Sequence, residues 1–268
     1  MPHDVDALRA LAIEAARAGA DVLRPRFRAA RTLIDRKSSA TDMVTDADRA
    51  SEAAIIDVIT RARPDDAILG EESGAREGTS GLRWVIDPLD GTTNFLYGIA
   101  QFCVSVAVED ADGSLVGCVL EPITNEEFVA TRGGGASCNG EPILASNQTD
   151  LEHALIATGF SYVAEDRERS ARLLPTVLPA VRDIRRAGSC ALDLAWVACG
   201  RVDGFYEELV FPWDIAAGTL LATEAGARVS LLADVTGRGP GLLAAADGIF
   251  EPLDALLATA RDAAGLRT

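Results

Sequence analysis

The residues best suited to chemistry lie in one segment, 84–95, with the sequence WVIDPLDGTTNF. Within it, Asp87 and Asp90 follow an apolar run and flank Pro88. Because Pro88 has no N–H for a sheet and disfavours a helical conformation at Asp87, we expect the chain to turn here with both carboxylates on one side. The Leu89 carbonyl lies between them, and Mg²⁺ prefers oxygen groups of this kind. A purely structural role, with Asp90 capping a helix and Asp87 in a turn, remains an alternative.

The next residues, 91–94, have the sequence GTTN and offer a glycine, two hydroxyl groups and the start of a short helix. The unpaired N–H groups and the dipole at a helix N-terminus attract phosphate. A metal site and a phosphate site are therefore expected within one turn of the chain. Histidine catalysis is not indicated, because the only histidines are His3 and His153 and neither belongs to a Ser-His-Asp or Cys-His set.

Three further stretches complete a pattern: 69–73 (LGEES), 212–218 (PWDIAAG), and 37–39 (KSS) with 44–48 (VTDAD). In their order and spacing, and together with the 84–95 segment, they resemble the inositol monophosphatase family. That family comprises lithium-sensitive, Mg²⁺-dependent phosphomonoesterases and includes fructose bisphosphatases and phosphoadenosine phosphatases. The resemblance covers nearly the whole chain. It implies a layered αβαβα sandwich of the α+β or α/β class.

The resemblance also implies the metal ligands. A first Mg²⁺ ion is expected on Glu71, Asp87 and the Leu89 carbonyl, and a second on Asp87, Asp90 and Asp214. A third, weaker ion is expected beside Glu71, and Mn²⁺ is a candidate substitute for Mg²⁺. The proximity agrees with the chemistry, because clustered carboxylates repel one another unless cations intervene, and paired metal ions stabilise both the attacking and the leaving oxygen of a displacement.

The catalytic residues implied by the resemblance are Glu71, Thr92 and Asp48. Thr92 and Asp48 are expected to position and deprotonate a metal-activated water that attacks the phosphate in line, without a covalent enzyme intermediate. Lys37 is a second-tier candidate: it is the only lysine of the chain, and the matching lysine of the family lies near the active-site loop.

Substrate contacts carried over from the resemblance lie in both halves: Asp90, Gly91, Thr92, Gly188, Ser189, Cys190 and Glu207. The amides of Gly91 and Thr92 are expected to hold the phosphate, and Glu207 to accept hydrogen bonds from ring hydroxyls. Ser189 serves equally well as a helix cap. The GTTNF sequence resembles the branch that acts on myo-inositol monophosphate, with fructose-1,6-bisphosphatase or another sugar-phosphate phosphatase as the alternative. A regulatory binding protein that retains the fold is an alternative of a different class.

The composition is consistent with this interpretation. The net charge of −16 disfavours nucleic acid and anionic membranes as partners. Five scattered cysteines without a CxxC pair indicate reduced thiols and a cytoplasmic protein. Apolar runs are much shorter than the about 20 residues that a membrane helix needs. We expect a small phosphorylated polyol as the partner and a homodimer as the assembly.

The elements that position these residues follow from hydrophobic periodicity. Residues 1–150 are expected to form a helix-packed antiparallel half that carries most metal ligands, and residues 151–268 an α/β half that carries Asp214 and substrate contacts, within one compact unit. Helices are predicted over 5–31 with a kink at Pro25, and over 46–63, 165–178, 189–199, 214–225 and 252–264. Strands are predicted over 67–72, 84–86, 102–109, 114–121, 127–131, 155–158, 184–186, 202–207, 228–232 and 241–245.

Overall fold

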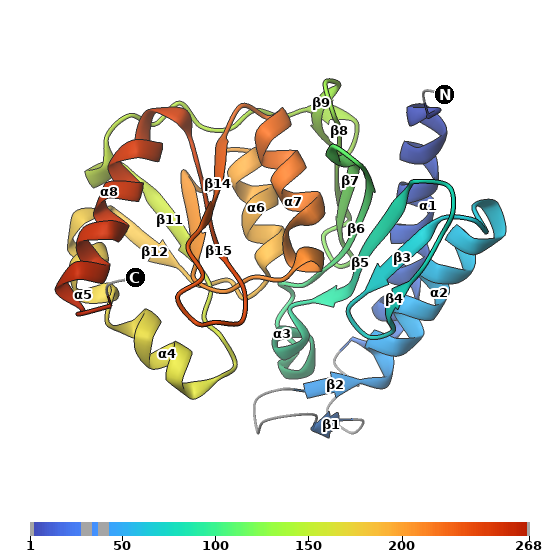
Figure 1. The fold of residues 1–268 in the computed structure, drawn as a ribbon, viewed down its shortest axis with the longest axis horizontal. Helices are drawn as coiled ribbons and strands as arrows, with labels where there is room; N and C mark the ends of the chain where they lie inside the picture. The colour runs from blue at the N-terminus through green and yellow to red at the C-terminus, as the bar shows by residue number, and fades with distance from the viewer. Residues whose placement is uncertain (1–2, 28–33, 37–42, 267–268) are drawn as a thin grey trace.

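The computed structural model describes residues 3–27, 34–36 and 43–266, and these form alternating layers of helix and sheet (Figure 1). The helices are α1 (Val5–Leu23), α2 (Asp46–Ala62), α3 (Thr92–Tyr97), α4 (Ala164–Ala171), α5 (Leu174–Val177), α6 (Cys190–Ala198), α7 (Pro212–Glu224) and α8 (Asp247–Ala263). Short 3₁₀ turns cover Arg24–Arg26, Leu151–His153 and Leu178–Ala180.

The larger sheet has the strand order β10-β9-β8-β7-β6-β5-β3-β4, in which only β3 and β5 run parallel to each other. Its strands are β3 (Ala67–Gly70), β4 (Gly74–Arg76), β5 (Arg83–Asp90), β6 (Cys103–Asp110), β7 (Gly113–Glu121), β8 (Glu126–Thr131), β9 (Gly135–Cys138) and β10 (Glu141–Pro142). The antiparallel meander expected in the first half is therefore confirmed at β6, β7 and β8. A separate antiparallel pair consists of β1 (Ile34–Arg36) and β2 (Met43–Thr45).

The smaller sheet has the order β12-β11-β13-β15-β14. Strand β11 is parallel to β12 and β13, whereas β15 is antiparallel to β13 and β14. Its strands are β11 (Leu155–Thr158), β12 (Asp183–Arg185), β13 (Gly204–Glu207), β14 (Arg228–Leu232) and β15 (Gly241–Ala245). The mixed topology, with helices between the strands, is that of an α/β half.

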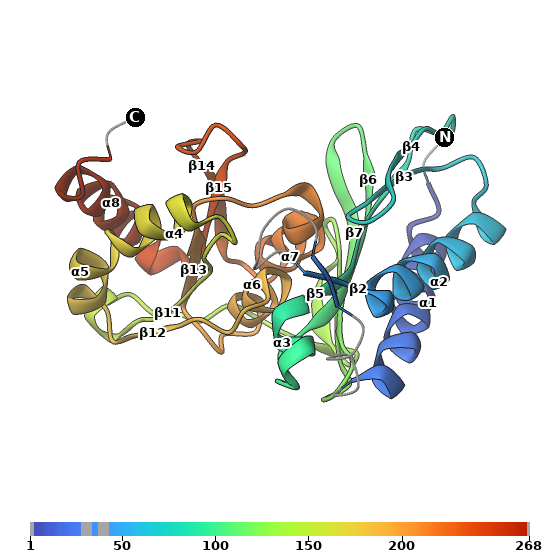
Figure 2. The same ribbon diagram turned by 90° about the horizontal axis from the view of Figure 1, so that it is seen from below.

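Apolar clusters fill the space between the layers. Helices α1 and α2 cover one face of the larger sheet, and α6 and α7 pack on its other face. The opposite side of α6 and α7 packs on the smaller sheet, whose outer face is covered by α5 and α8. Both ribbon views show this helix-sheet-helix-sheet-helix order, so the expected αβαβα sandwich is confirmed (Figures 1 and 2).

The structure corrects the bounds of several predicted elements: the final helix begins at Asp247 rather than at Pro252, and the strand predicted over 67–72 ends at Gly70. The first helix ends at Leu23 rather than near residue 31, because a 3₁₀ turn begins at Arg24 beside Pro25. The helix predicted over 165–178 is two short helices, and both the second one and the 3₁₀ turn after it begin with a proline near their first position. The strand predicted to stop before Asp87 continues to Asp90.

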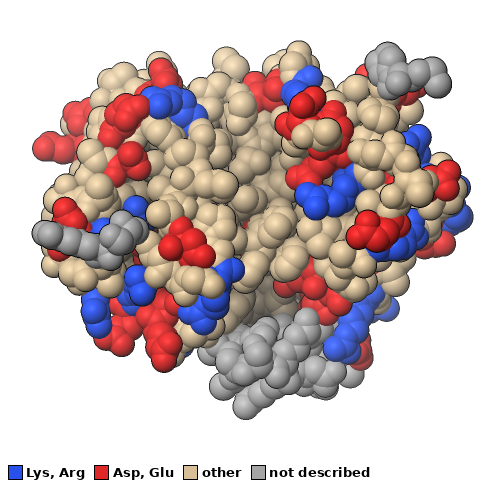
Figure 3. All heavy atoms as spheres, in the orientation of Figure 1, with Lys and Arg blue, Asp and Glu red and all other residues tan. Residues whose placement is uncertain are grey.

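The surface carries no single block of charge on the face that Figure 3 shows. Acidic and basic side chains are intermingled toward both sides of that face, and a largely uncharged band runs between them (Figure 3). The excess of acids is thus spread rather than gathered there. Within the described residues, no helix is long and apolar enough to cross a membrane, and each of the five cysteines is a free thiol.

Candidate active site

Strand β5 carries Asp87 and Asp90 past a break in its pairing with β6. Asp87 pairs with Ser105 and Asp90 with Cys103, and the register shifts between them. Such a bulge bends a strand and redirects its side chains, and Pro88, which cannot donate to a ladder, lies within it. The predicted turn is therefore wrong, because the strand continues to Asp90 and bulges at Pro88 instead of turning there.

The bulge is fixed from two sides. The Leu89 N–H donates to Asp87 Oδ1 at 3.0 Å. From α2, the buried hydroxyl of Ser51 donates to the Pro88 carbonyl at 3.0 Å. These bonds hold the segment that presents both carboxylates.

Immediately after the strand, Gly91 has a φ of +99° and precedes α3. A Cβ at this position would lie 2.9 Å from the Gln101 carbonyl oxygen, so the turn has room only for glycine. The Thr92 hydroxyl donates to the Leu89 carbonyl at 3.1 Å. One of the expected catalytic residues thus contacts one of the expected metal ligands.

The second half of the chain contributes residues at the N-terminal ends of α6 and α7 to the site. Ser189 Oγ and the Ala191 N–H both donate to Asp90 Oδ2, each at 2.6 Å. Asp214, in the first turn of α7, accepts from the Phe211 N–H at 2.7 Å. The predicted cap is also present, because Ser189 Oγ accepts from the Leu192 N–H at 3.3 Å.

The structure brings the expected acidic ligands into one group whose charges act on one another. Burial raises the pKa of Asp87 well above its usual value, and Glu71, Asp90 and Asp214 raise it further. The Glu71 residue is exposed, yet partial desolvation by the surrounding protein, together with the charges of Asp214 and Asp48, raises its pKa to about 8. Burial and Asp90 likewise raise the pKa of Asp214.

Clustered carboxylates that repel one another are suited to a divalent cation, which prefers oxygen ligands and would relieve the repulsion. Among the described residues, however, no group of three or more His, Cys, Asp or Glu side chains is already arranged to hold a metal. One carboxylate oxygen of each of Asp87, Asp90 and Asp214 accepts a hydrogen bond from a backbone N–H. The residues fit the ions chemically, because the four acids supply oxygen ligands and a cation would neutralise their grouped charges.

A cavity of about 100 Å³ adjoins these acids. It unites six residues expected from the sequence to bind metal or substrate: Asp90, Gly188, Ser189, Cys190, Glu207 and Asp214. Burial raises the pKa of Glu207 to about 8, with Asp90 adding to the rise and Arg186 opposing it. Gly91 and Thr92 are not among the residues that line this cavity, and Lys37 lies outside the described residues.

Four residues of the site were not identified from the sequence. Asn94 Nδ2 donates to the Gln101 and Ala187 carbonyls at 2.6 and 2.7 Å, which ties α3 to the segment before α6. Tyr162 lines the cavity, and its hydroxyl lies 3.3 Å from that of Thr93. Arg186 and Asp193 also line it. Asn94 stands in the recognised motif, whereas no sequence signal marked the other three.

The chain is similar to known proteins in both sequence and structure. The family model described as inositol monophosphatase family matches residues 4–265. The chain is 43% identical over 229 residues to the Nus factor SuhB of Escherichia coli, covering 85% of each protein. Among solved structures, SuhB of Mycobacterium tuberculosis is 38% identical with a TM-score of 0.83, covering 99% of this chain and 100% of that one. An inositol monophosphatase from an Anabaena (Nostoc) species is 34% identical with a TM-score of 0.82, covering 96% and 97%.

Proposed function

This chain belongs to the inositol monophosphatase family and is a phosphomonoesterase, and we propose that it hydrolyses the phosphate monoester of a small polyol, myo-inositol monophosphate above all, with Mg²⁺. The observation that carries the proposal is the group formed by Glu71, Asp87, Asp90 and Asp214. These carboxylates come from three places in the fold, the end of β3, strand β5 and the first turn of α7. Neighbouring carboxylates raise the pKa of Glu71, Asp87 and Asp214, and Asp90 and Asp214 line the cavity.

In the proposed reaction, Glu71, Asp87, Asp90, Asp214 and the Leu89 carbonyl would hold Mg²⁺ ions, which when bound would supply Lewis-acid stabilisation of the phosphoryl oxygens. Mn²⁺ could replace Mg²⁺, and a third ion beside Glu71 belongs to the same proposal. Thr92 and Asp48 orient the attacking water and accept its proton. The amides of Gly91 and Thr92 bind the phosphate.

On the other side of the phosphate, the polyol occupies the cavity beside α6. There the proposed contacts are Gly188, Ser189, Cys190 and Glu207, with the Glu207 carboxyl hydrogen-bonded to polyol hydroxyls. Fructose-1,6-bisphosphate or another sugar phosphate is the alternative substrate, since the phosphate contacts are the same for each. Lys37 keeps its second-tier role in this proposal.

The test is the release of inorganic phosphate from myo-inositol 1-phosphate by the purified protein. We expect release with Mg²⁺, none after chelation, and a loss of at least about 100-fold in kcat for Asp90→Asn, because removal of one electrostatic contact in a preorganised site costs about that much. Asp254→Asn, an exposed change on α8, is the control that should retain activity. Undiminished release in chelator would contradict the metal role. Parallel kcat/KM values for fructose-1,6-bisphosphate decide between the substrates.

The name that the SuhB relatives share, Nus factor, favours a second candidate function, association with the transcription machinery. The net charge of −16 argues for a protein partner rather than direct binding of RNA. Co-elution of the purified chain with a transcription complex, in the presence and absence of RNA, tests this role separately from phosphatase activity.

Four further properties accompany the proposal. We expect a homodimer, which light scattering at micromolar concentration would contradict by giving the monomer mass. Lithium inhibition and a cytoplasmic location follow from the same family assignment, and the free thiols agree with the location. We also propose that residues 1–150 supply most of the metal ligands, whereas residues 151–268 supply Asp214 and the substrate contacts.

A further inference from the structure

The cavity beside α6 contains a buried acid to which no role has been assigned. Asp193 lies in the first turn of α6, one turn after Ser189, and lines the cavity together with Glu207 and Arg186. Its side chain is 1% exposed. Within the part of the chain that the structure describes, its Oδ1 atom is buried and has no hydrogen-bond partner.

An unpartnered buried carboxyl is costly, and protein interiors normally avoid it. Burial raises the pKa of Asp193 well above its usual value, Asp90 and Glu207 raise it further, and Arg186 opposes the rise. No ion pair to Asp193 is formed among the described residues, although the Arg186 guanidinium lines the same cavity.

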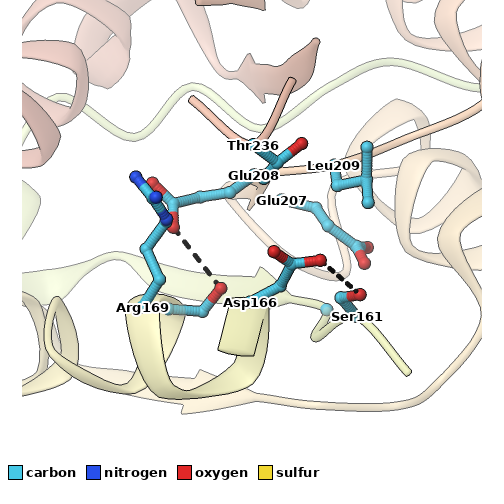
Figure 4. A pocket seen from close by; sticks show the side chains of 9 residues that line it. Ser161, Asp166, Arg169, Glu207, Glu208, Leu209 and Thr236 are labelled. Carbon is cyan, nitrogen blue, oxygen red and sulfur yellow. Dashed lines mark hydrogen bonds between the residues drawn. The ribbon is translucent and has the colours of Figure 1, made fainter. Parts of the chain in front are cut away.

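Asp166 provides an internal comparison. It is similarly buried, at 5% exposed, and lies on a smaller cavity that shares Gly159 and Glu207 with the first. There Ser161 Oγ donates to Asp166 at 3.0 Å, as Figure 4 shows, and Arg238 forms an ion pair with it. The fold therefore provides partners for one buried acid near Glu207 and leaves the other without one.

We propose that Asp193 is a specificity-determining residue that binds a hydroxyl group of the polyol part of the substrate. The inference rests on the proposed phosphatase function and extends it. Together with Glu207, Asp193 gives the cavity two carboxyls that can form hydrogen bonds with hydroxyl groups. A polyhydroxylated substrate satisfies both groups, whereas an ester without hydroxyls leaves Asp193 unpaired.

The experiment compares two substrates of the Mg²⁺-loaded enzyme, myo-inositol 1-phosphate and p-nitrophenyl phosphate, which has no hydroxyl group beyond its phosphate. For Asp193→Ala, we expect the ratio of kcat/KM values, inositol ester over nitrophenyl ester, to fall at least about tenfold, mainly through KM for the inositol ester. Asp193→Asn retains an acceptor oxygen and should fall less. The exposed Asp254→Ala change on α8 should leave the ratio unaltered.

Thermal melting separates this role from a structural one. Removing an unpaired buried acid should leave Tm unchanged or raise it for Asp193→Ala, whereas Asp166→Ala should lower Tm because Ser161 and Arg238 lose their partner. If both Asp193 variants lowered kcat/KM equally for the two esters, or left the ratio at the wild-type value, the inference would be wrong and the phosphatase function would stand. If the wild-type enzyme hydrolysed neither ester, the proposed function itself would fail.

Discussion

At the scale of single residues, Ser189 contributes both to the stability of α6 and to the position of Asp90, a proposed metal ligand. Its hydroxyl accepts from the Leu192 N–H as the cap of α6 and donates to Asp90. We expect Ser189→Ala to cost about 1 kcal/mol of unfolding free energy, the usual cost of a lost cap, and also to lower kcat/KM because Asp90 loses a partner.

A matched control exists at the start of α1, where Asp4 caps the helix by accepting from the Ala7 N–H at 3.1 Å. Asp4→Ala should cost a similar amount in urea unfolding and leave kcat/KM unaltered. Equal kinetics for the two variants would show that the Ser189–Asp90 bond does not support the site.

Glu207 should make the metal-free protein sensitive to pH. Its pKa is raised to about 8 in the fold, against an ordinary value near 4.5. The folded state therefore holds a proton that the unfolded state has released. This stabilising contribution is complete below about pH 4.5 and is lost as the pH rises toward 8.

We accordingly expect the Tm of the chelated protein to fall between pH 5 and pH 9, and to fall less steeply in Glu207→Gln, which has no proton to lose. Differential scanning calorimetry of both proteins across this range measures the difference. Parallel pH profiles would mean that Glu207 is ionised in the fold. Asp150→Asn, at an exposed carboxylate paired with His153, is a control that should not reproduce the change.

Residues that belong to the recognised motifs could be identified in advance, and residues that only the fold brings to the site could not. Asp87 and Asp90 were found from their spacing around Pro88, and Asp214 and Glu207 from motif resemblance. No sequence motif identified Asp193, although it falls within the helix predicted over 189–199. Its significance depends on Glu207, which reaches the same cavity from a strand.

At the scale of elements, the junction of β5 and α3 depends on the backbone of Gly91. Its φ is +99°, and a side chain has no space there because its Cβ would lie only 2.9 Å from the Gln101 carbonyl oxygen. Gly91→Ala should lose more stability than the about 1–2 kcal/mol of left-handed strain alone, and phosphate release should fall as well.

Gly113 provides a control that distinguishes backbone strain from the lack of space for a side chain. It has a φ of +106° in the β6–β7 turn, but a Cβ there would meet nothing within 4 Å. Gly113→Ala should therefore show only the strain, in urea unfolding, with normal kcat/KM. A smaller loss for Gly91→Ala than for Gly113→Ala would contradict the packing argument.

The elements themselves were largely predictable where periodicity was strong. The second helix was expected over 46–63 and is found at Asp46–Ala62, because its apolar stripe ends just before Pro64. The first helix and the 165–178 helix were predicted too long, since periodicity continued across prolines whose backbone begins a new turn. The bulge at Pro88 could not be foreseen, because it depends on pairing with β6.

For the whole molecule, the layered architecture followed from the resemblance rather than from the pattern of strands and helices. Periodicity indicated an antiparallel half and an α/β half, but it could not show that α6 and α7 form the layer between the two sheets. That arrangement depends on clusters that draw residues from both sheets. It also delivers Asp214 and Ser189 to the bulge that carries Asp87 and Asp90.

Because the proposed metal ligands come from both halves, Mg²⁺ should stabilise the whole molecule. An ion that binds only the folded state adds about 2.7 kcal/mol at 100 times its Kd, equivalent to a rise in Tm of about 5–10 °C for a chain of this size. The rise should be larger at pH 8 than at pH 5, where the protonated carboxyls bind metal poorly. Sodium chloride at equal ionic strength controls for screening, which matters for a chain with a net charge of −16. Asp214→Asn should lose most of the rise in Tm caused by Mg²⁺, whereas the control Asp254→Asn should keep it. An equal rise in Tm in sodium chloride would contradict a metal site between the halves and would assign the effect to screening.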